Sequence, residues 1–182
     1  MTVRQLTPHD AAAYQQLRLR GLQESPTAFS ASYSDEAARS LAEIAVRVTP
    51  APDGSLCVFG AYADGQLVGI VAFIRPSREK LRHCAELAGM YVAPEFRQRG
   101  LGRTLLDAAL AHGRSLRGVR QLKLAVNAAN TAARALYQSR GFTRYGVEPE
   151  ALLVAGCYYD EELYVLRLTE APEPDAEVRG AR

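Results

Sequence analysis

The stretch that decides the fold is Val92-Ala93-Pro94-Glu95-Phe96-Arg97-Gln98-Arg99-Gly100-Leu101-Gly102-Arg103. It joins a predicted strand to a predicted helix. A helix start carries free N–H groups and about half a positive charge, and glycines let an oxyanion reach those donors without meeting a Cβ. With Arg97, Arg99 and Arg103 around it, this loop is predicted to bind an anion such as a di- or polyphosphate. The alternative interpretation is a tight turn with a solvated basic face.

Two common nucleotide-binding motifs do not fit this loop. The dinucleotide pattern GxGxxG would need a glycine where the sequence has Leu105. A Walker A loop would need Gly-Lys-Ser or Gly-Lys-Thr, and neither follows the glycines.

The pattern on either side of the loop predicts a mixed α/β fold. Asp64-Gly65 lies between two β-rich runs and predicts a hairpin, whereas residues 27–34 are interpreted as an irregular loop. The expected elements are strand 2–6, helix 8–23, helix 37–48, strands 55–63, 66–75 and 83–92, helix 100–117, strand 121–127, helix 130–140, and strands 142–147 and 157–168. We expect one domain over residues 1–168, with a mixed, mostly antiparallel twisted sheet of about seven strands and about four flanking helices. Residues 169–182 are charged and proline-containing, and they are predicted to form a disordered tail.

Composition excludes several classes of protein. The 182 residues include 22 Lys and Arg against 20 Asp and Glu, a net charge of +2 that does not favour a nucleic-acid partner. No apolar run approaches the ~20 residues of a membrane span, and the first ten residues do not resemble a secretory signal. Cys57, Cys84 and Cys157 are widely spaced and odd in number. They predict neither a disulfide scaffold nor a metal site, and they favour a cytoplasmic protein.

A second motif follows 30 residues after the first and reads Asn127-Ala128-Ala129-Asn130-Thr131-Ala132-Ala133-Arg134-Ala135-Leu136-Tyr137-Gln138-Ser139-Arg140-Gly141-Phe142. It resembles N-x-x-A-x-x-L-Y-x-x-x-G-F, while Arg97-x-x-Gly100-x-Gly102 resembles Q/R-x-x-G-x-G/A. These are two signatures of the GNAT N-acetyltransferase superfamily. Each motif alone is weak, but both occur at the family's spacing and in the expected elements. The resemblance covers residues 2–168, and the expected order β-α-α-β-β-β-α-β-α-β-β matches the family's fold.

The resemblance implies acetyl-CoA as the acyl donor and no metal. In the family, loop amides bind the CoA pyrophosphate, and the splayed end of the fourth strand pairs with the pantetheine arm. Asn130 matches a residue that contacts that arm, and Tyr137 matches a tyrosine near the CoA sulfur. The cofactor-binding residues implied are Met90, Tyr91, Val92, Arg97, Gln98, Arg99, Gly100, Leu101, Gly102, Arg103, Asn130 and Tyr137.

The chemistry of acetyl transfer needs an acid and a base. An amine attacks the thioester, and the leaving thiolate, whose conjugate acid has a pKa of about 8.5, can take a proton from the Tyr137 phenol. The alternative for Tyr137 is a core aromatic. Glu86, six residues before Val92, matches the glutamate base of the histone-acetylating branch. Its neighbours Cys84 and Ala88 suggest partial desolvation, which would raise its pKa; the alternative is a half-buried carboxylate paired with an arginine.

The acceptor is the least determined part of the prediction. The ribosomal-protein branch of the family has a glutamate where this chain has Ala125, which argues against a simple transfer of that substrate. Phe29 and Tyr33 fall where the family lines its acceptor site, although packing roles are the alternative. We therefore expect acetyl transfer to a primary amine of a small molecule, peptide or protein. The rival hypotheses are an acyl-CoA sensor without turnover and a transferase with a longer acyl donor; the family also implies a homodimer through the exposed last strands.

Overall fold

The computed structural model describes residues 1–168, so the predicted tail over residues 169–182 lies outside the described residues. Seven strands form one sheet in the order β1-β2-β3-β4-β5-β7-β6. Neighbouring strands are antiparallel except β4 and β5, which are parallel. The strands are β1 Thr2–Gln5, β2 Leu56–Ala63, β3 Gln66–Ile74, β4 Cys84–Val92, β5 Gln121–Asn127, β6 Thr143–Val154 and β7 Cys157–Arg167. The helices are α1 Ala11–Glu24, α2 Tyr33–Ala37, α3 Leu41–Val48, α4 Leu101–Ser115 and α5 Thr131–Gln138, with 3₁₀ turns η1 Pro8–Asp10, η2 Pro26–Ala28, η3 Glu79–Leu81 and η4 Pro94–Phe96.

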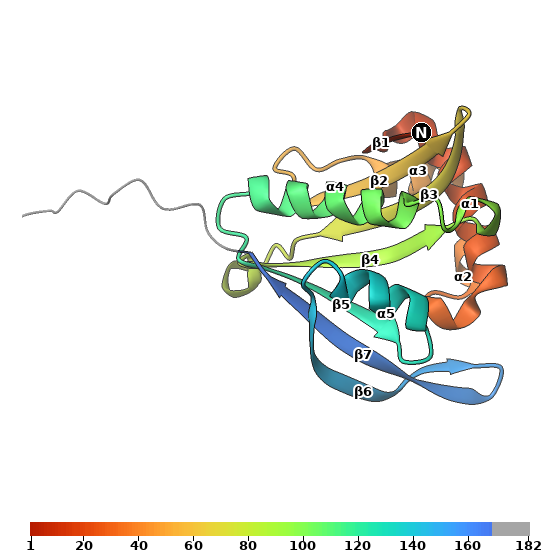
Figure 1. Ribbon diagram of the computed structural model, residues 1–182. Helices are drawn as coiled ribbons and strands as arrows, with labels where there is room; N and C mark the ends of the chain where they lie inside the picture. Colours follow the sequence, from red (N-terminus) through yellow and green to blue (C-terminus); the bar gives the residue numbers. More distant parts are fainter. Residues whose placement is uncertain (169–182) are drawn as a thin grey trace, which may run out of the picture.

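Helices cover the two faces of the sheet unequally. In Figure 1, α4 crosses β2–β4 and α5 lies over β5 and β7, while α1, α2 and α3 lie behind the first half of the sheet. The core on the α4 side includes Leu105, Leu106 and Phe73, all fully buried. The core on the other face includes Leu17 and Ile44. Helices α1 and α4 thus bury apolar side chains against the strands, and α3 packs against α1. This burial is the main stabilising contribution to the fold.

The order of elements is as predicted, with two differences. The helix expected over residues 37–48 begins only at Leu41, where Ser40 caps α3 through a capping box with Glu43. A separate short helix, α2, precedes it, and Ser32 caps α2 by accepting from the Asp35 N–H. The stretch expected to be an irregular loop therefore contains the start of α2. The strand expected over residues 142–147 continues to Val154. It is an edge strand, where proline is tolerated, and its register shifts beyond Glu148.

The feature that shapes the site is the separation of β4 from β5. Their parallel pairing ends at Glu86 and Lys123, so the rest of β4 has no pairing with β5. Near the separation β4 carries a bulge, where Gly89 has φ +61° and the register with β3 shifts. Figure 1 shows the two strands diverging towards their carboxyl ends. A wedge-shaped opening between two strands of one sheet is the result.

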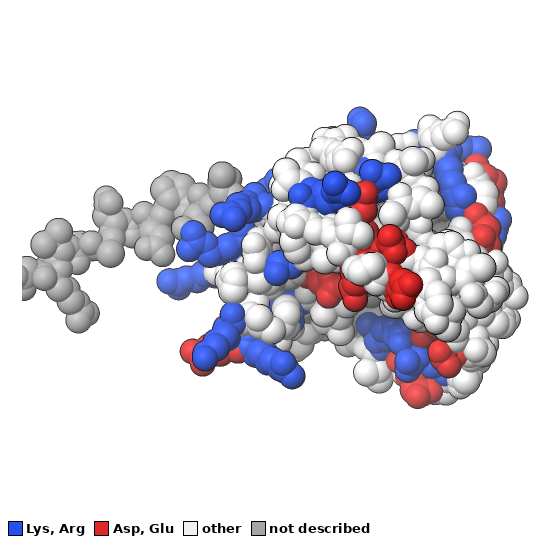
Figure 2. All heavy atoms as spheres, turned by 90° about the horizontal axis from the view of Figure 1, so that it is seen from below, with Lys and Arg blue, Asp and Glu red and all other residues white. Residues whose placement is uncertain are grey.

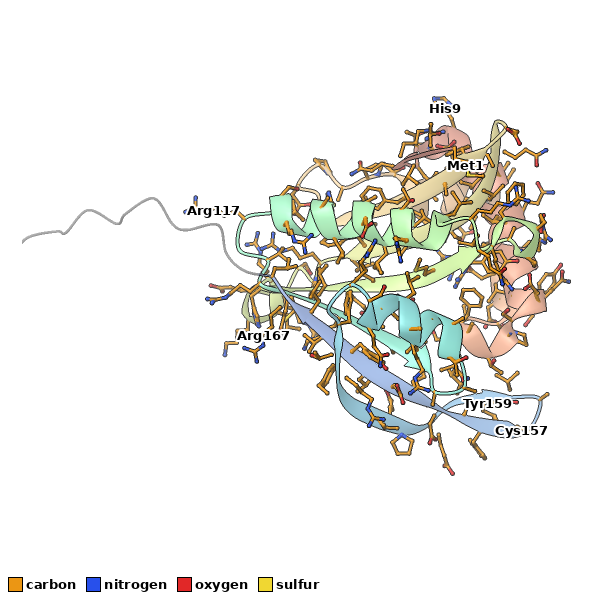
Figure 3. All side chains as sticks on the ribbon, in the orientation of Figure 1. Met1, His9, Arg117, Cys157, Tyr159 and Arg167 are labelled. Carbon is orange, nitrogen blue, oxygen red and sulfur yellow. The ribbon has the colours of Figure 1, made fainter. Side chains whose placement is uncertain are left out.

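The β6–β7 hairpin extends the sheet at the same end as this opening. Figure 3 labels Cys157 and Tyr159 near the turn of the hairpin, whereas Arg117 and Arg167 lie at the opposite end of the molecule. Figure 2 shows acidic side chains gathered in the middle of the face seen from below, with basic side chains spread around them. Within residues 1–168, no helix is long and apolar enough to cross a membrane.

Candidate active site

A cleft of about 830 Å³ opens where β4 and β5 separate. The carboxyl end of β4, the loop before α4 and the start of α5 surround it. The structure brings together every predicted cofactor-binding residue except Arg99, whose guanidinium instead lies 5.3 Å from the ring centre of Phe96. The predicted residues lining the cleft are Met90, Tyr91, Val92, Arg97, Gln98, Gly100, Leu101, Gly102, Arg103, Asn130 and Tyr137.

The loop presents the N-terminus of α4 to the cleft. Gly100 is the N-cap with φ +80°, and a Cβ added to it would meet no atom within 4 Å. Gln98 also has a positive φ, of 60°. The first hydrogen bond of α4 runs from the N–H of Thr104 to the carbonyl of Gly100. The preceding N–H groups have no intrahelical partner and can bind an anion, assisted by the helix dipole.

The three arginines of the loop have different roles. Arg97 donates from Nε to the carbonyl of Val92 at 2.9 Å and from Nη2 to Glu24 at 2.6 Å. It therefore fastens the loop to the end of β4. Arg103 is exposed and lines the cleft, whereas Arg99 does not line it. The sequence could not distinguish these roles, because Glu24 is 73 residues away from Arg97.

Tyr137 is a core aromatic residue that also lines the cleft. It is 8% exposed and packs against Phe142, with ring centres 5.9 Å apart. Its hydroxyl donates to the sulfur of Met90, another lining residue, at 3.6 Å. Burial raises the pKa of Tyr137 to about 12, so the phenol keeps its proton at neutral pH. A protonated donor at this position can supply a proton to a leaving group in the cleft.

Two asparagines line the cleft where β5 ends and α5 begins. The Asn130 side chain accepts from the N–H of Ala133 at 3.1 Å and so caps α5. Asn127 is buried and was not singled out from the sequence. Its Oδ1 accepts from the N–H of Ala129 at 2.8 Å, and its Nδ2 donates to the carbonyl of Thr27 at 3.1 Å. Asn127 thereby links the end of β5 to η2 across the cleft.

The base candidates lie on β4 and β7. Glu86 is exposed and does not line the cleft, so the expected partial desolvation of this carboxylate is wrong. The sequence missed Glu161, which is half-buried and whose pKa is raised by burial and by the charges of Glu148 and Glu86. Glu148 and Glu161 are partners in the register of β6 with β7, for which the sequence has no local signal. Within residues 1–168, no three His, Cys, Asp or Glu side chains are grouped to hold a metal ion.

The two predicted acceptor residues do not line the cleft. Phe29 is 6% exposed, and the guanidinium of Arg18 lies 4.5 Å from the centre of its ring. Tyr33 begins α2 and is 42% exposed. Phe29 is therefore a packing residue. Arg18, which lies over its ring, was not indicated by the sequence.

Comparison with known proteins decides the family. Residues 19–142 match the acetyltransferase (GNAT) family. The chain belongs to this family. A solved structure of yncA from Salmonella typhimurium, described as a putative acetyltransferase with its cofactor acetyl-CoA, superimposes on this GNAT chain with a TM-score of 0.77 and 25% identity, covering 97% of this chain and 98% of that one. The resemblance stated from the two motifs is confirmed.

Two curated relatives are similar over shorter stretches. A mycothiol acetyltransferase of Thermobispora bispora is 58% identical over 57 residues, which are 31% of this GNAT chain and 19% of the relative. The L-amino acid N-acyltransferase MnaT of Escherichia coli is 32% identical over 100 residues, which are 55% of this chain and 57% of that protein. The chain thus matches about a fifth of the length of the mycothiol acetyltransferase and less than two thirds of the length of MnaT.

Proposed function

We propose that this protein transfers an acetyl group from acetyl-CoA to a primary amine by direct attack in a ternary complex. The observation that carries the proposal is the cleft between β4 and β5, which runs from the free N–H groups of α4 to the hydroxyl of Tyr137. A phosphate-binding end and a proton donor thus lie in one cavity. When bound, acetyl-CoA supplies a thioester whose carbonyl carbon an amine can attack.

Different residues that line the cleft bind different parts of acetyl-CoA. The loop amides from Gln98 to Arg103 and the N-terminus of α4 hold the pyrophosphate. The unpaired edge of β4 beyond Glu86 offers backbone N–H and C=O groups to the pantetheine arm. Asn130 limits the cleft on the α5 side, and Arg97 keeps the loop in place through Val92 and Glu24.

Proton transfer completes the reaction. The amine nitrogen bonds to the carbonyl carbon and loses its proton to Glu86, Glu161 or a water molecule. The carbon–sulfur bond breaks, and Tyr137 donates its proton to the departing sulfur. A backbone N–H at the bulge of β4 stabilises the negative charge that develops on the carbonyl oxygen. The Tyr137 phenolate then regains a proton from solvent.

Tyr137→Phe tests this assignment. The substitution keeps the ring contact with Phe142, and the lost hydroxyl makes one 3.6 Å contact to sulfur, so we expect a stability change of about 1 kcal/mol or less. We expect kcat to fall about 10²–10⁴-fold with little change in acetyl-CoA affinity. The matched control is Tyr62→Phe, whose hydroxyl binds Asp10 and does not line the cleft. Equal turnover in both variants would remove Tyr137 from the mechanism, whereas acetyl-CoA binding with no turnover in the wild type would favour the non-catalytic sensor.

The cytoplasmic location of the enzyme is also a proposal. Cys57, Cys84 and Cys157 are all free thiols in the structure, as in most cytoplasmic proteins. A homodimer through the β6 edge and the preference for acetyl over longer acyl groups stay predictions. Competition between acyl-CoA donors of different chain length tests the preference for acetyl groups.

A further inference from the structure

A second pocket, of about 500 Å³, lies on the face of the sheet opposite α4. Helices α1, α2 and α3 and strands β2, β3 and β4 surround it, on the side of the sheet where Figure 1 shows the first three helices. Its apolar floor comes from strand side chains that include Val58, Ile70 and Ala72. Its polar wall comes from the helices and includes Arg18 and Glu36.

The second pocket approaches the cleft at the bulge of β4. Ala88 and Gly89 line both this pocket and a small cavity of about 60 Å³. Met90 and Tyr137 line both that small cavity and the cleft. One strand at its bulge therefore separates the second pocket from the place where the proposed acid lies. A molecule in the pocket lies against the point where β4 borders the cleft.

The helical wall of the pocket carries more positive than negative charge. Glu36 is 2% exposed and accepts hydrogen bonds from Arg18, Arg39 and Arg47. Burial alone would raise the pKa of Glu36, but these arginines lower it below its usual value, so the group stays ionised. Three guanidinium groups thus meet one buried carboxylate. Positive charge is left over even when Asp35, which also lines the pocket, is counted.

Arg18 is the guanidinium held nearest the bulge. Its Nε donates to Glu36 at 3.3 Å, and its plane lies over the ring of Phe29. Its Nη1 is buried and has no hydrogen-bond partner among residues 1–168. A Cβ added to Gly89 would lie 3.1 Å from this nitrogen. A buried donor without a partner costs free energy unless a ligand or water satisfies it, and a fixed guanidinium suits a carboxylate.

We propose that the second pocket binds the acceptor, and that the acceptor is a small amine carrying a carboxylate held by Arg18. The inference rests on the proposed function and goes beyond it by naming a substrate class and a specificity residue. The carboxylate neutralises the charge left over on the helical wall. An apolar side chain of the acceptor packs on the floor of the pocket, and the amine faces the bulge at Gly89. An α-amino acid with an apolar side chain has all three groups.

The test compares acids with their amides. L-methionine and L-methioninamide differ at the carboxylate, and release of the CoA thiol reports kcat/KM for each. We expect the wild-type protein to favour the acid by about 10- to 100-fold, the usual effect of a hydrogen bond to a charged group. Arg18→Gln should abolish this preference, while Arg18→Lys should restore part of it. Comparing the acid-to-amide ratio between variants cancels the difference in basicity of the two amines.

Arg20→Gln is the matched control for loss of an arginine from α1. Arg20 pairs with Glu95 at 2.7 Å, its side chain is 48% exposed, and it lines neither the cleft nor the second pocket. We expect this variant to keep the preference for the acid. Loss of the preference in Arg20→Gln to the same extent as in Arg18→Gln would overturn the assignment to Arg18.

A binding measurement separates this inference from the proposed function. Calorimetry with CoA present compares N-acetyl-L-methionine with N-acetyl-L-methioninamide and needs no turnover. Tighter binding of the acid, lost in Arg18→Gln, supports the inference even if no amine is acetylated, and in that case the proposed transfer alone fails. Equal binding of both compounds, binding of neither, or a wild-type preference for the amide overturns the carboxylate proposal and leaves acetyl transfer to other amines standing.

Discussion

Replacing Gly100 by glutamate tests the anion site against a control that the chain itself provides. Gly100 and Gly65 both have φ +80°, both are exposed, and a Cβ added to either would meet no atom within 4 Å. A side chain at either position therefore strains the backbone to the same degree, by roughly 1–2 kcal/mol. Gly100 lines the cleft, whereas Gly65 is in the turn between β2 and β3 and does not line it.

The expected loss of affinity follows from Coulomb's law. The carboxylate that Gly100→Glu introduces, at about 5 Å from a phosphate charge, is repelled by roughly 1 kcal/mol in a water-like dielectric and roughly 3 kcal/mol at an effective dielectric constant near 20. Affinity for acetyl-CoA should therefore fall about 5- to 150-fold in Gly100→Glu. In Gly65→Glu the affinity should stay at the wild-type value, although urea unfolding should show a similar loss of stability in both variants.

Calorimetric titration of each variant with acetyl-CoA is the assay. Raising the salt concentration should reduce the difference between Gly100→Glu and wild type, because exposed charges are screened. Unchanged affinity in Gly100→Glu, or an equal loss in Gly65→Glu, would refute the assignment of the pyrophosphate to this loop.

Three further predictions concern the carboxylates and a helix cap. Glu36→Gln should lower the free energy of unfolding by about 1.5–3 kcal/mol, because three arginines lose a buried, charged hydrogen-bond acceptor. Since the pKa of Glu36 is lowered in the folded state, its contribution is full above the ordinary value and is lost as the pH falls through the acid range; urea unfolding should therefore show a weaker acid dependence in the variant than in wild type. Glu86→Gln should lose activity near neutral pH and regain part of it at high pH, where more amine is unprotonated. A flat profile in that variant, with activity lost in Glu161→Gln, would transfer the base to Glu161. Asn130→Ala should cost about 1 kcal/mol in thermal unfolding, because α5 loses its cap; an unchanged melting temperature would contradict this.

Local signals in the sequence were sufficient for most of the fold. Asp64-Gly65 specified its hairpin because a two-residue turn with positive φ at both positions needs such residues. Gly100, whose φ is positive, marked the loop before α4 as an anion site, whereas the motif around Tyr137 was located by its resemblance to the family. The helix α2 escaped prediction because five residues are too few to produce a periodic pattern.

The parts of the site that the sequence could not give depend on contacts between distant residues. Arg18 and Glu36 are 18 residues apart, on different helices, and no spacing rule connects them. Glu86 is exposed although Cys84 is buried and Ala88 is half-buried on the same strand, so the apolar character of these neighbours did not predict its exposure. Burial is the largest cause of the raised pKa of Glu161, and the charges of Glu148 and Glu86, on two other strands, raise it further. Charge networks of this kind are visible in the assembled structure alone.

The most direct test of acetyl transfer is the release of free CoA thiol from acetyl-CoA by the full chain. The acceptor panel contains amino acids, their amides, polyamines, aminoglycosides and peptides with a free N-terminus or lysine, and mass spectrometry identifies the acetylated product. We expect thiol release that depends on the amine and yields one acetylated amine per thiol. Binding of acetyl-CoA by calorimetry without release for any amine would contradict the catalytic claim and favour a sensor, and absence of binding would contradict the cleft assignment itself.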